Sequence, residues 1–379
     1  MELPLEIVVA IAAVVLAAAV TTVRGRRQGS FEQCHWRSLT PSQSLRDLQL
    51  DFMFAALACI VLVTGTAGLA SPMPDLSQRV CWVTGASSGI GRATAVALAS
   101  GGARVILSAR REDVLKEAAA ECVAASPTRD ASRIRVFPLD LSAPPTTLAT
   151  RADEALKAFD APVDLLVNKC VARRRGVSPR PLMLPPRYSG GISTRARAED
   201  TDLEVTETLM RVNFLSAVAL TKACLPAMLD RRRGDIVVVS SVQGRLAIPM
   251  RAAYAASKHA CHGYFESLRA EVADRDLNVF IVCPGYVRTA LSLNALTGGG
   301  ERYGQMDATT AAGLDPSVVA REIIDGVLAR KHESVLADLK SRIAILLRAL
   351  LPNVLCGVMA KRYLKERDKA TAMPPASRS

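Results

Sequence analysis

Tyr254 and Lys258 are the residues whose types and spacing most clearly suit chemistry. They are four residues apart in AAYAASKHA, a run of good helix formers. On a helix, this spacing places the phenol and the ammonium on one face, one turn apart. A nearby cation favours the phenolate, so such a tyrosine can exchange a proton with a substrate near neutral pH. Ser241 ends the apolar run DIVVVSS, a predicted buried strand, and strengthens this interpretation over that of an ordinary amphipathic helix.

A nucleotide-binding pattern lies upstream, around residue 85. Residues 80–84, VCWVT, predict a short buried strand, and GASSGIG at 85–91 joins it to a helical pattern. Backbone N–H groups in such a turn can approach a pyrophosphate at the positive end of the helix. Further strands are predicted at 103–109, 133–140 and 163–168, alternating with helical segments. The alternation predicts an α/β fold with a doubly wound parallel sheet.

Two arginines follow the second predicted strand. NAD-binding sites usually carry an acid there, which binds the ribose hydroxyls. This chain has Arg110 and Arg111 instead, and its first acid is Glu112. Two guanidinium groups suit a 2′-phosphate, so we predict NADP(H) over NAD(H). The alternative is that the pair simply opens a helix in solvent.

The composition argues against several other classes of protein. With 379 residues, of which 50% are hydrophobic, the chain can bury a large core and is neither disordered nor fibrous. The formal net charge is +12, but the basic excess is concentrated in residues 169–189 and 339–379. Nucleic acid is therefore not an expected partner, whereas the basic tail suits an anionic membrane surface.

The cysteines and histidines show no spacing typical of metal ligands. The nine cysteines are scattered and form no C-x-x-C pair. They predict free thiols in the core, with no disulfide framework and no metal site. His259 and His262 lie one turn apart on the predicted catalytic helix, and we interpret them as surface or packing residues.

Two apolar segments precede the predicted catalytic domain. Residues 7–23 and 52–70 each approach the about 20 residues that a spanning helix needs. A signal peptide is the alternative for the first, but Glu2 and Glu6 stand where basic residues would be expected. The second segment is the better candidate for an anchor. The domain would face the cytosol if only the first segment spans, and the lumen if the second spans.

These features divide the chain into three regions. Residues 1–74 form the membrane-anchoring region, 75–338 the catalytic domain and 339–379 a basic tail. Residues 343–360 are apolar but contain Arg348 and Pro352, so they predict an amphipathic surface helix pair rather than a span. Residues 291–315 are long, glycine-rich and without periodicity, and we interpret them as a lid.

Taken together, the ordered motifs resemble the short-chain dehydrogenase/reductase family over residues 78–338. The resemblance rests on TGASSGIG at 84–91, Asp140-Leu141, Asn213, Ser241, Tyr254-x-x-x-Lys258 and PGYVRT at 284–289. It implies a single Rossmann-like domain and a carbonyl reductase, or the reverse alcohol dehydrogenase. Stretches such as AYAASKHA and ERYGQMD resemble a membrane-anchored branch, which implies the endoplasmic reticulum membrane, with the peroxisomal membrane as the alternative. Homodimers are common in the family.

The resemblance also implies a role for each matching residue. Tyr254 would be the general acid, Ser241 would hold the carbonyl oxygen, Lys258 would bind the nicotinamide ribose, and Asn213 would hold a water of the proton relay. Besides Arg110 and Arg111, the cofactor-binding residues implied by the resemblance are the following: Gly85, Ser87, Ser88, Gly89, Ile90 and Gly91 at the phosphates; Asp140 and Leu141 at the adenine; Asn168 at the end of the fourth strand; Tyr254 and Lys258 of the catalytic helix; and Pro284, Gly285, Val287 and Thr289 at the nicotinamide.

The chain departs from the family pattern after Asn168. Family members continue with a second asparagine and small residues, whereas this chain has Lys169 and a basic, proline-rich insert that ends at residue 189. The insert is either a native loop that alters access to the cofactor or a translated intron. The intron is the favoured hypothesis, because its excision restores Asn-Asn-Gly-Gly in frame. Sequencing the transcript across codons 165–195 separates the two.

The resemblance leaves the substrate open. Lipophilic candidates are an acyl-dihydroxyacetone-phosphate, a steroid or a retinoid. The alternative function is a catalytically impaired membrane scaffold or regulator with the same fold, which the disturbed region after Asn168 favours and the intact Ser241, Tyr254, Lys258 and Asn213 oppose.

Overall fold

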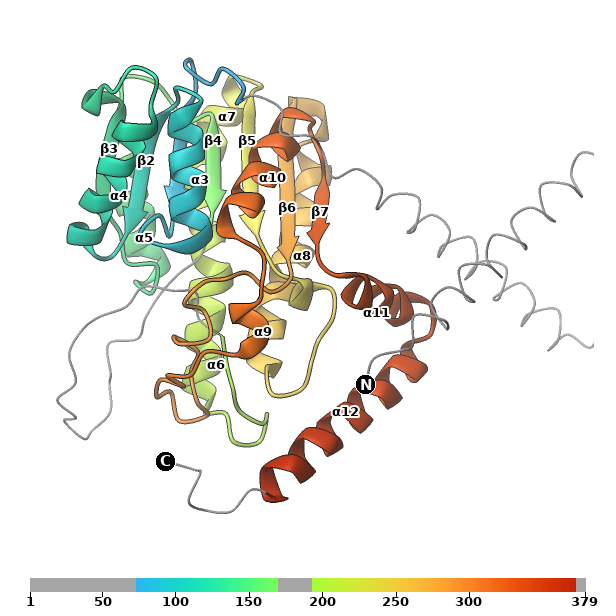
Figure 1. Cartoon of the computed structure of the whole chain (residues 1–379). Helices are drawn as coiled ribbons and strands as arrows, with labels where there is room; N and C mark the ends of the chain where they lie inside the picture. The colour runs from blue at the N-terminus through green and yellow to red at the C-terminus, as the bar shows by residue number, and fades with distance from the viewer. Residues whose placement is uncertain (1–72, 170–192, 373–379) are drawn as a thin grey trace, which may run out of the picture. The chain divides into compact units, whose positions relative to one another are not determined.

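The computed structural model describes residues 73–169 and 193–372, and its centre is a parallel sheet (Figure 1). The seven strands lie in the order β3-β2-β1-β4-β5-β6-β7, and every neighbouring pair is parallel. The predicted doubly wound sheet is therefore confirmed. The strands are β1 Val80–Thr84, β2 Arg104–Ala109, β3 Ile134–Pro138, β4 Leu165–Asn168, β5 Gly234–Val239, β6 Leu277–Pro284 and β7 Glu333–Leu336.

The strand order reverses direction beside β1. The chain runs outward from β1 through β2 to β3, and then crosses back so that β4 pairs with the other side of β1. In open parallel sheets, ligands bind outside the carboxyl ends of the strands at such a reversal. Residues that follow β1 and β4 are thereby brought to one place, although they are far apart in sequence.

Three helices cover each face of the sheet because the strands are apolar on both faces. On one face, Val83 and Leu107 share a core with α3, α4 and α10; on the other, Trp82 and Ile106 share a core with α5, α7 and α8. The first group is α3 Gly89–Ser100, α4 Glu112–Ala125 and α10 Pro316–Leu328. The second group is α5 Pro145–Ala155, α7 Ser216–Asp230 and α8 Ala252–Glu271.

The remaining elements are short helices, helical turns and the two C-terminal helices. α6 Leu203–Met210 and α9 Ala308–Ala311 are placed beyond the carboxyl ends of the strands (Figure 1). The short helical turns are η1 Ala131–Arg133, η3 Val242–Gly244 and η4 Ala273–Arg275, and η2 Arg211–Leu215 is a π-helical segment. The C-terminal helices are α11 Leu339–Leu350 and α12 Pro352–Ala372, where Pro352 occupies a first-turn position that proline favours.

One continuous helix among the described residues is long and apolar enough to cross a membrane. It runs from Leu203 to Asp230 and combines α6, η2 and α7. Its buried residues pack into the cores described above, as a core helix of this length does. The two candidate spans, at 7–23 and 52–70, and the insert from residue 170 onward lie outside the described residues.

Of the six cysteines in the described part of the chain, five lie in the core, as predicted, and one does not. Cys81, Cys122, Cys224, Cys261 and Cys283 are free and buried, and Cys356 is free and exposed. Burial raises the pKa of the thiols of Cys81, Cys122 and Cys224 to about 12. These thiols are therefore protonated and unreactive at neutral pH.

The contact between α10 and β6 gives a test of core packing. A Cβ on Gly326 would lie 2.3 Å from the ring of Phe280, so Gly326→Ala forces a shift in a buried contact. We expect a loss of about 1–3 kcal/mol in the free energy of unfolding, measured by chemical denaturation. The control is Gly263→Ala in α8, which has no neighbour within 4 Å of the added methyl group and should keep or raise stability. Equal stability of the two variants would contradict the packing argument.

Candidate active site

The turn between β1 and α3 is built for close approach to an anion. Gly85 and Gly89 have positive φ values of 63° and 55°. A Cβ on Gly91 would lie 2.3 Å from the carbonyl oxygen of Gly85, so glycine permits the helix to pack against the turn. α3 starts at Gly89, which directs its first N–H groups at this turn. The hydroxyl of Ser87 is buried and has no hydrogen-bond partner, as suits a donor that awaits a phosphate oxygen.

The end of β2 lies beside this turn. The N–H of Ala86 donates to the carbonyl of Ser108 over 3.1 Å, two residues before Arg110. Arg111 is the N-cap residue of α4, and both arginines are partly exposed and engaged by neighbours in this structure. The pair is thus positioned at the carboxyl edge of the sheet, next to the glycine turn.

The residues predicted at the adenine follow β3 at the same edge. The N–H of Leu139 donates to the carbonyl of Ala109 over 2.9 Å, which holds this segment against the end of β2. Asp140 is exposed, and its carboxylate accepts hydrogen bonds from the N–H and hydroxyl of Ser142 at 3.0 and 2.7 Å. Leu141 is buried. The carboxylate of Asp140 therefore stabilises the local turn.

Asn168 ends β4 and is completely buried. Its Nδ2 donates to Thr221 Oγ1 over 3.1 Å, and its Oδ1 has no partner. Lys169 turns away from the strand, with its N–H donating to Thr84 Oγ1 over 3.0 Å. Asn168 is therefore a fixed amide between β1 and α7, with one acceptor left for a further group.

Ser241, Tyr254 and Lys258 come together where β5 meets α8. Lys258 Nζ donates to the carbonyl of Val239, the last residue of β5, over 3.0 Å. The same nitrogen lies 6.0 Å from the centre of the Tyr254 ring. Ser241 is the N-cap of η3, and its hydroxyl accepts from the N–H of Gln243 over 3.1 Å. The three residues are only 7%, 6% and 5% exposed, respectively.

Asn213 lies in a widened helical turn and is connected to this group by hydrogen bonds. It lies in the π-helical segment, a local irregularity that frequently marks functional sites. Its Nδ2 donates to Ser257 Oγ over 3.0 Å, and that hydroxyl donates to the carbonyl of Tyr254 over 2.7 Å. Cys261 also donates to the Asn213 carbonyl over 3.3 Å. The structure thus places all four predicted catalytic residues around α8.

The segment after β6 connects the two halves of the site. The N–H of Gly285 donates to the carbonyl of Leu336 in β7 over 2.8 Å, which fixes where the segment leaves the sheet. Pro284 and Val287 are buried. Thr289 lies against the glycine turn, because its Cγ2 is 2.8 Å from the position of a Cβ on Gly89. The predicted phosphate and nicotinamide segments therefore touch.

The predicted lid, 291–315, is held by one carboxylate. Asp307 accepts hydrogen bonds from Arg195, which follows the insert, from Arg251, which precedes α8, and from Ser292. Burial raises the pKa of the Asp307 carboxyl, but the hydrogen bonds and charges of these partners outweigh it and bring the pKa below its ordinary value. The Asp307 cluster, defined as these four residues, connects three separate segments of the chain.

Sequence reasoning did not identify the Asp307 cluster, Thr221 or Ser257. Their partners are 15 to 112 positions away for the cluster and 53 and 44 positions away for Thr221 and Ser257. No periodicity or short motif connects residues at such distances. Ser257 alone carried a local signal, since it lies beside Lys258 on a predicted helix.

Comparisons with known proteins agree with this geometry. A profile of the family described as short chain dehydrogenase matches residues 79–297. The chain is 38% identical over 338 residues to dehydrogenase/reductase SDR family member 7B of Bos taurus, and the match covers 86% of this chain and 97% of that protein.

Two solved structures share the fold. A metagenomic short-chain oxidoreductase in complex with NADP has a TM-score of 0.51 and 26% identity, over 69% of this chain and 97% of that one. A short-chain dehydrogenase/reductase from Burkholderia phymatum in complex with NAD has a TM-score of 0.56 and 21% identity, over 80% of this chain and 98% of that one.

Asp307→Asn tests the contribution of the Asp307 cluster to stability. The substitution leaves two largely buried guanidinium groups without their shared carboxylate, so we expect a loss of about 1–3 kcal/mol in the free energy of unfolding at pH 7. Because the folded pKa of Asp307 is lowered, its stabilisation is complete above the ordinary carboxyl pKa and is lost as pH falls through the folded value. The difference between the variant and wild type should therefore shrink below about pH 4.

Asp276→Asn is the matched control for this measurement. Asp276 pairs with Arg330 on the surface, where both side chains are more than half exposed, so the expected change is below about 1 kcal/mol. Its backbone is left-handed, a conformation that asparagine tolerates. If Asp307→Asn lowered the free energy of unfolding no more than this control, the Asp307 carboxylate would not be stabilising the segment 291–315.

Proposed function

The chain belongs to the short-chain dehydrogenase/reductase family, and on that premise we propose that it is an NADP(H)-dependent oxidoreductase that interconverts a carbonyl and a secondary alcohol on a lipophilic substrate. The observation that carries the proposal is the meeting of Ser241, Tyr254 and Lys258 at the carboxyl edge of the sheet. The glycine turn and the segment after β6 reach the same edge and touch through Thr289.

Ser241, Tyr254 and Lys258 each have a separate role in the proposed reaction. A nicotinamide cofactor supplies or accepts the hydride when it is bound. In carbonyl reduction, Ser241 donates a hydrogen bond to the substrate oxygen, and Tyr254 gives that oxygen a proton. The Lys258 ammonium stabilises the phenolate that remains. Burial of all three keeps water away from the developing charge and strengthens these interactions.

The choice of NADP(H) rests on Arg110 and Arg111. The fold itself accepts either dinucleotide, since its structural neighbours include complexes with NADP and with NAD. The distinction therefore depends on the side chains after β2, where two guanidinium groups can bind a 2′-phosphate in a way that a carboxylate cannot. The neighbour that holds NADP is the more similar in sequence of the two and supports the same choice.

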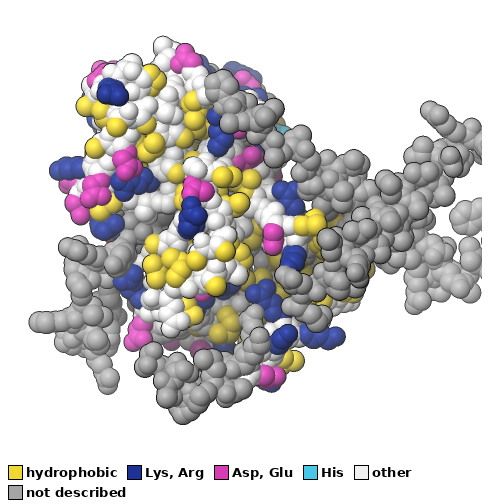
Figure 2. Space-filling view, in the orientation of Figure 1, with side chains coloured by type: hydrophobic (Ala, Val, Ile, Leu, Met, Phe, Trp, Pro, Cys, Tyr) yellow, Lys and Arg dark blue, Asp and Glu magenta, His cyan; other side chains and the backbone are white. Residues whose placement is uncertain are grey.

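Exposed apolar side chains support a lipophilic substrate. Met306, Leu314 and Val318 are exposed on or next to the segment that the Asp307 cluster holds. Figure 2 shows hydrophobic side chains gathered in the lower half of this face, where α9 and its flanking segments lie in Figure 1. Monomeric soluble domains rarely keep contiguous apolar surface without a use. A lipid, steroid or retinoid that enters from a membrane would contact such a surface.

The cellular setting is part of the proposal. The candidate spans at 7–23 and 52–70 would anchor the protein in a membrane, with the endoplasmic reticulum favoured and the peroxisomal membrane as the alternative. Homodimer formation is also proposed, because homodimers are common in the family.

Tyr254→Phe tests the reaction. We expect NADPH consumption, with a panel of lipophilic carbonyl compounds, to fall by about 10²–10⁴-fold in kcat, because the proton donor is lost while the ring remains. NADPH binding, measured by fluorescence, should change little. Tyr264→Phe on the same helix is the control and should keep wild-type turnover, since Tyr264 packs against Phe214 and Phe265 away from the site. Full activity of Tyr254→Phe on every substrate would favour the scaffold hypothesis.

A double variant, Arg110→Ala with Arg111→Ala, tests the cofactor. Loss of charge-assisted hydrogen bonds to the 2′-phosphate should raise the Kd for NADPH by about 10–100-fold and leave the Kd for NADH nearly unchanged. Arg275→Ala removes an exposed arginine next to the start of β6, at the opposite edge of the sheet, and should alter neither constant. An equal increase in the Kd for NADPH and for NADH would show that the arginines do not recognise the 2′-phosphate.

A further inference from the structure

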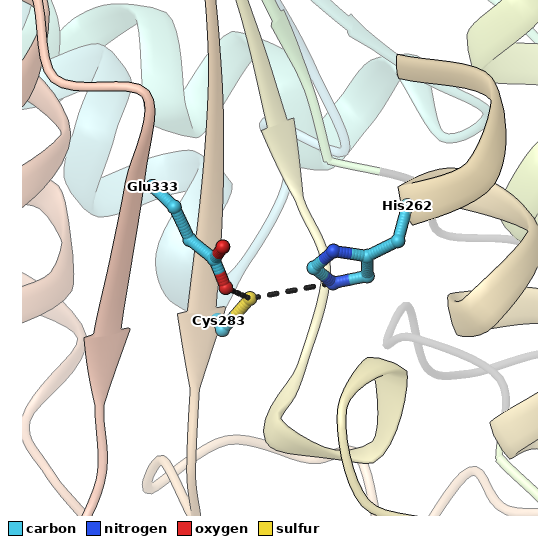
Figure 3. Close-up of side chains that lie close together, drawn as sticks. All are labelled: His262, Cys283 and Glu333. Carbon is cyan, nitrogen blue, oxygen red and sulfur yellow. Dashed lines mark hydrogen bonds between the residues drawn. The ribbon is translucent and has the colours of Figure 1, made fainter. Parts of the chain in front are cut away.

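Three side chains with metal-binding atoms lie close together between α8, β6 and β7. His262 of α8, Cys283 of β6 and Glu333 of β7 each place one such atom within 4.8 Å of the others, as Figure 3 shows. His262 and Cys283 are buried, and Glu333 is partly exposed. No sequence motif connects these three residues, because they lie on three separate elements.

The distances around the sulfur suit a tetrahedral zinc ion. Cys283 Sγ lies 3.5 Å from His262 Nε2 and 3.6 Å from Glu333 Oε1. With Zn–S near 2.3 Å and Zn–N or Zn–O near 2.0–2.2 Å, tetrahedral geometry places sulfur about 3.6 Å from either other donor. Two edges of the coordination polyhedron are therefore already present, and the third pair of donors, on His262 and Glu333, lies within 4.8 Å, so an ion would draw these two groups closer together.

The surrounding groups orient these atoms as outer partners of a metal site do. His262 Nδ1 lies 3.1 Å from Glu266 Oε1, and since a carboxylate accepts, this nitrogen carries the proton and Nε2 presents its lone pair to Cys283. Arg245 Nε donates to Glu333 Oε1 over 2.8 Å. Histidine and carboxylate ligands are typically held by such second partners. Arg245 and Glu333 are partly exposed, which gives an ion a path from solvent.

An unpartnered hydroxyl lies on a further side of the cluster. Ser240 Oγ is buried without a hydrogen-bond partner. It lies 2.7 Å from the position of a Cβ on Gly244, and His262 Nε2 lies at the same distance from that point. A polar atom that is buried and unsatisfied commonly indicates a missing ion or water. Ser240 can therefore hold a water in the fourth position.

We propose that His262, Cys283 and Glu333 bind one zinc ion. Binding forms the Zn–S, Zn–N and Zn–O bonds and releases the Cys283 thiol proton to solvent, with no change in oxidation state. Without a cation, burial keeps the pKa of this thiol raised, so the sulfur is protonated in the metal-free protein. The zinc ion and Arg245 balance the thiolate, Glu333 and Glu266, which makes the assembly neutral. The zinc ion would connect α8, β6 and β7, about one turn of α8 after Lys258.

Cobalt substitution in the purified full-length protein tests the site. Titration with Co²⁺ should produce a thiolate-to-cobalt charge-transfer band in the near ultraviolet that saturates at one equivalent, and Zn²⁺ should displace it. Cys283→Ser should abolish the band and weaken zinc affinity by about 100-fold or more, measured by competition with a chelator. Zinc should also raise the Tm of wild type but not of Cys283→Ser.

Two further variants distinguish loss of the site from loss of the fold. Cys224→Ser alters another buried thiol, remote from the cluster, and should keep the band and the stoichiometry. Glu266→Gln changes a partly exposed outer partner, and should weaken zinc binding by about 10–100-fold while the band remains. A wild-type protein that shows no charge-transfer band, or a band that persists in Cys283→Ser, would overturn the proposal and leave a hydrogen bond from Cys283 to His262.

Discussion

The catalytic end of this protein depends on the burial of one ammonium group. An unpaired charge cannot be taken out of water without a cost of several kcal/mol, so Lys258 requires polar partners inside the domain. The carbonyl of Val239, the last residue of β5, supplies one of them over 3.0 Å. This contact fixes the position of α8 against the end of the sheet. Tyr254, one turn earlier, and Ser241, two residues after Val239, are placed by the same constraint.

The sheet order explains why the other parts of the site arrive at the same edge. Parallel strands all end on one side, so the segments that follow β1, β2, β4, β5 and β6 converge there. The close contact between Gly89 and Thr289 shows how tightly they converge, since 200 residues of chain separate the two. The segment 291–315 is attached to its neighbours through Asp307, whose carboxylate is shared by two arginines from different segments.

Several features that depend on neighbours in the chain could be predicted from the sequence. The glycine turn and the Tyr254–Lys258 spacing are local patterns, and the predicted strands agree with the observed ones within two residues at each end, but no strand was predicted for β6. Contacts such as Arg195 with Asp307 or Asn168 with Thr221 depend on how distant elements pack, and one sequence does not encode them as a pattern. For the same reason the sequence left open whether His262 is a surface or a packing residue, and the structure shows that it is buried.

The π-helical segment at Arg211–Leu215 divides the helix that contains it into two packing regions. Before it, Val205 and Leu209 share a small core with Tyr254 and Leu296; after it, α7 packs into the large core of the sheet. The wider turn changes which side of the helix faces inward, so the stretches before and after it pack against different elements. Evolution can therefore vary the first stretch to reshape the surroundings of Tyr254 while the second continues to support the fold. Such modularity would let related enzymes acquire new specificities without rebuilding their cores.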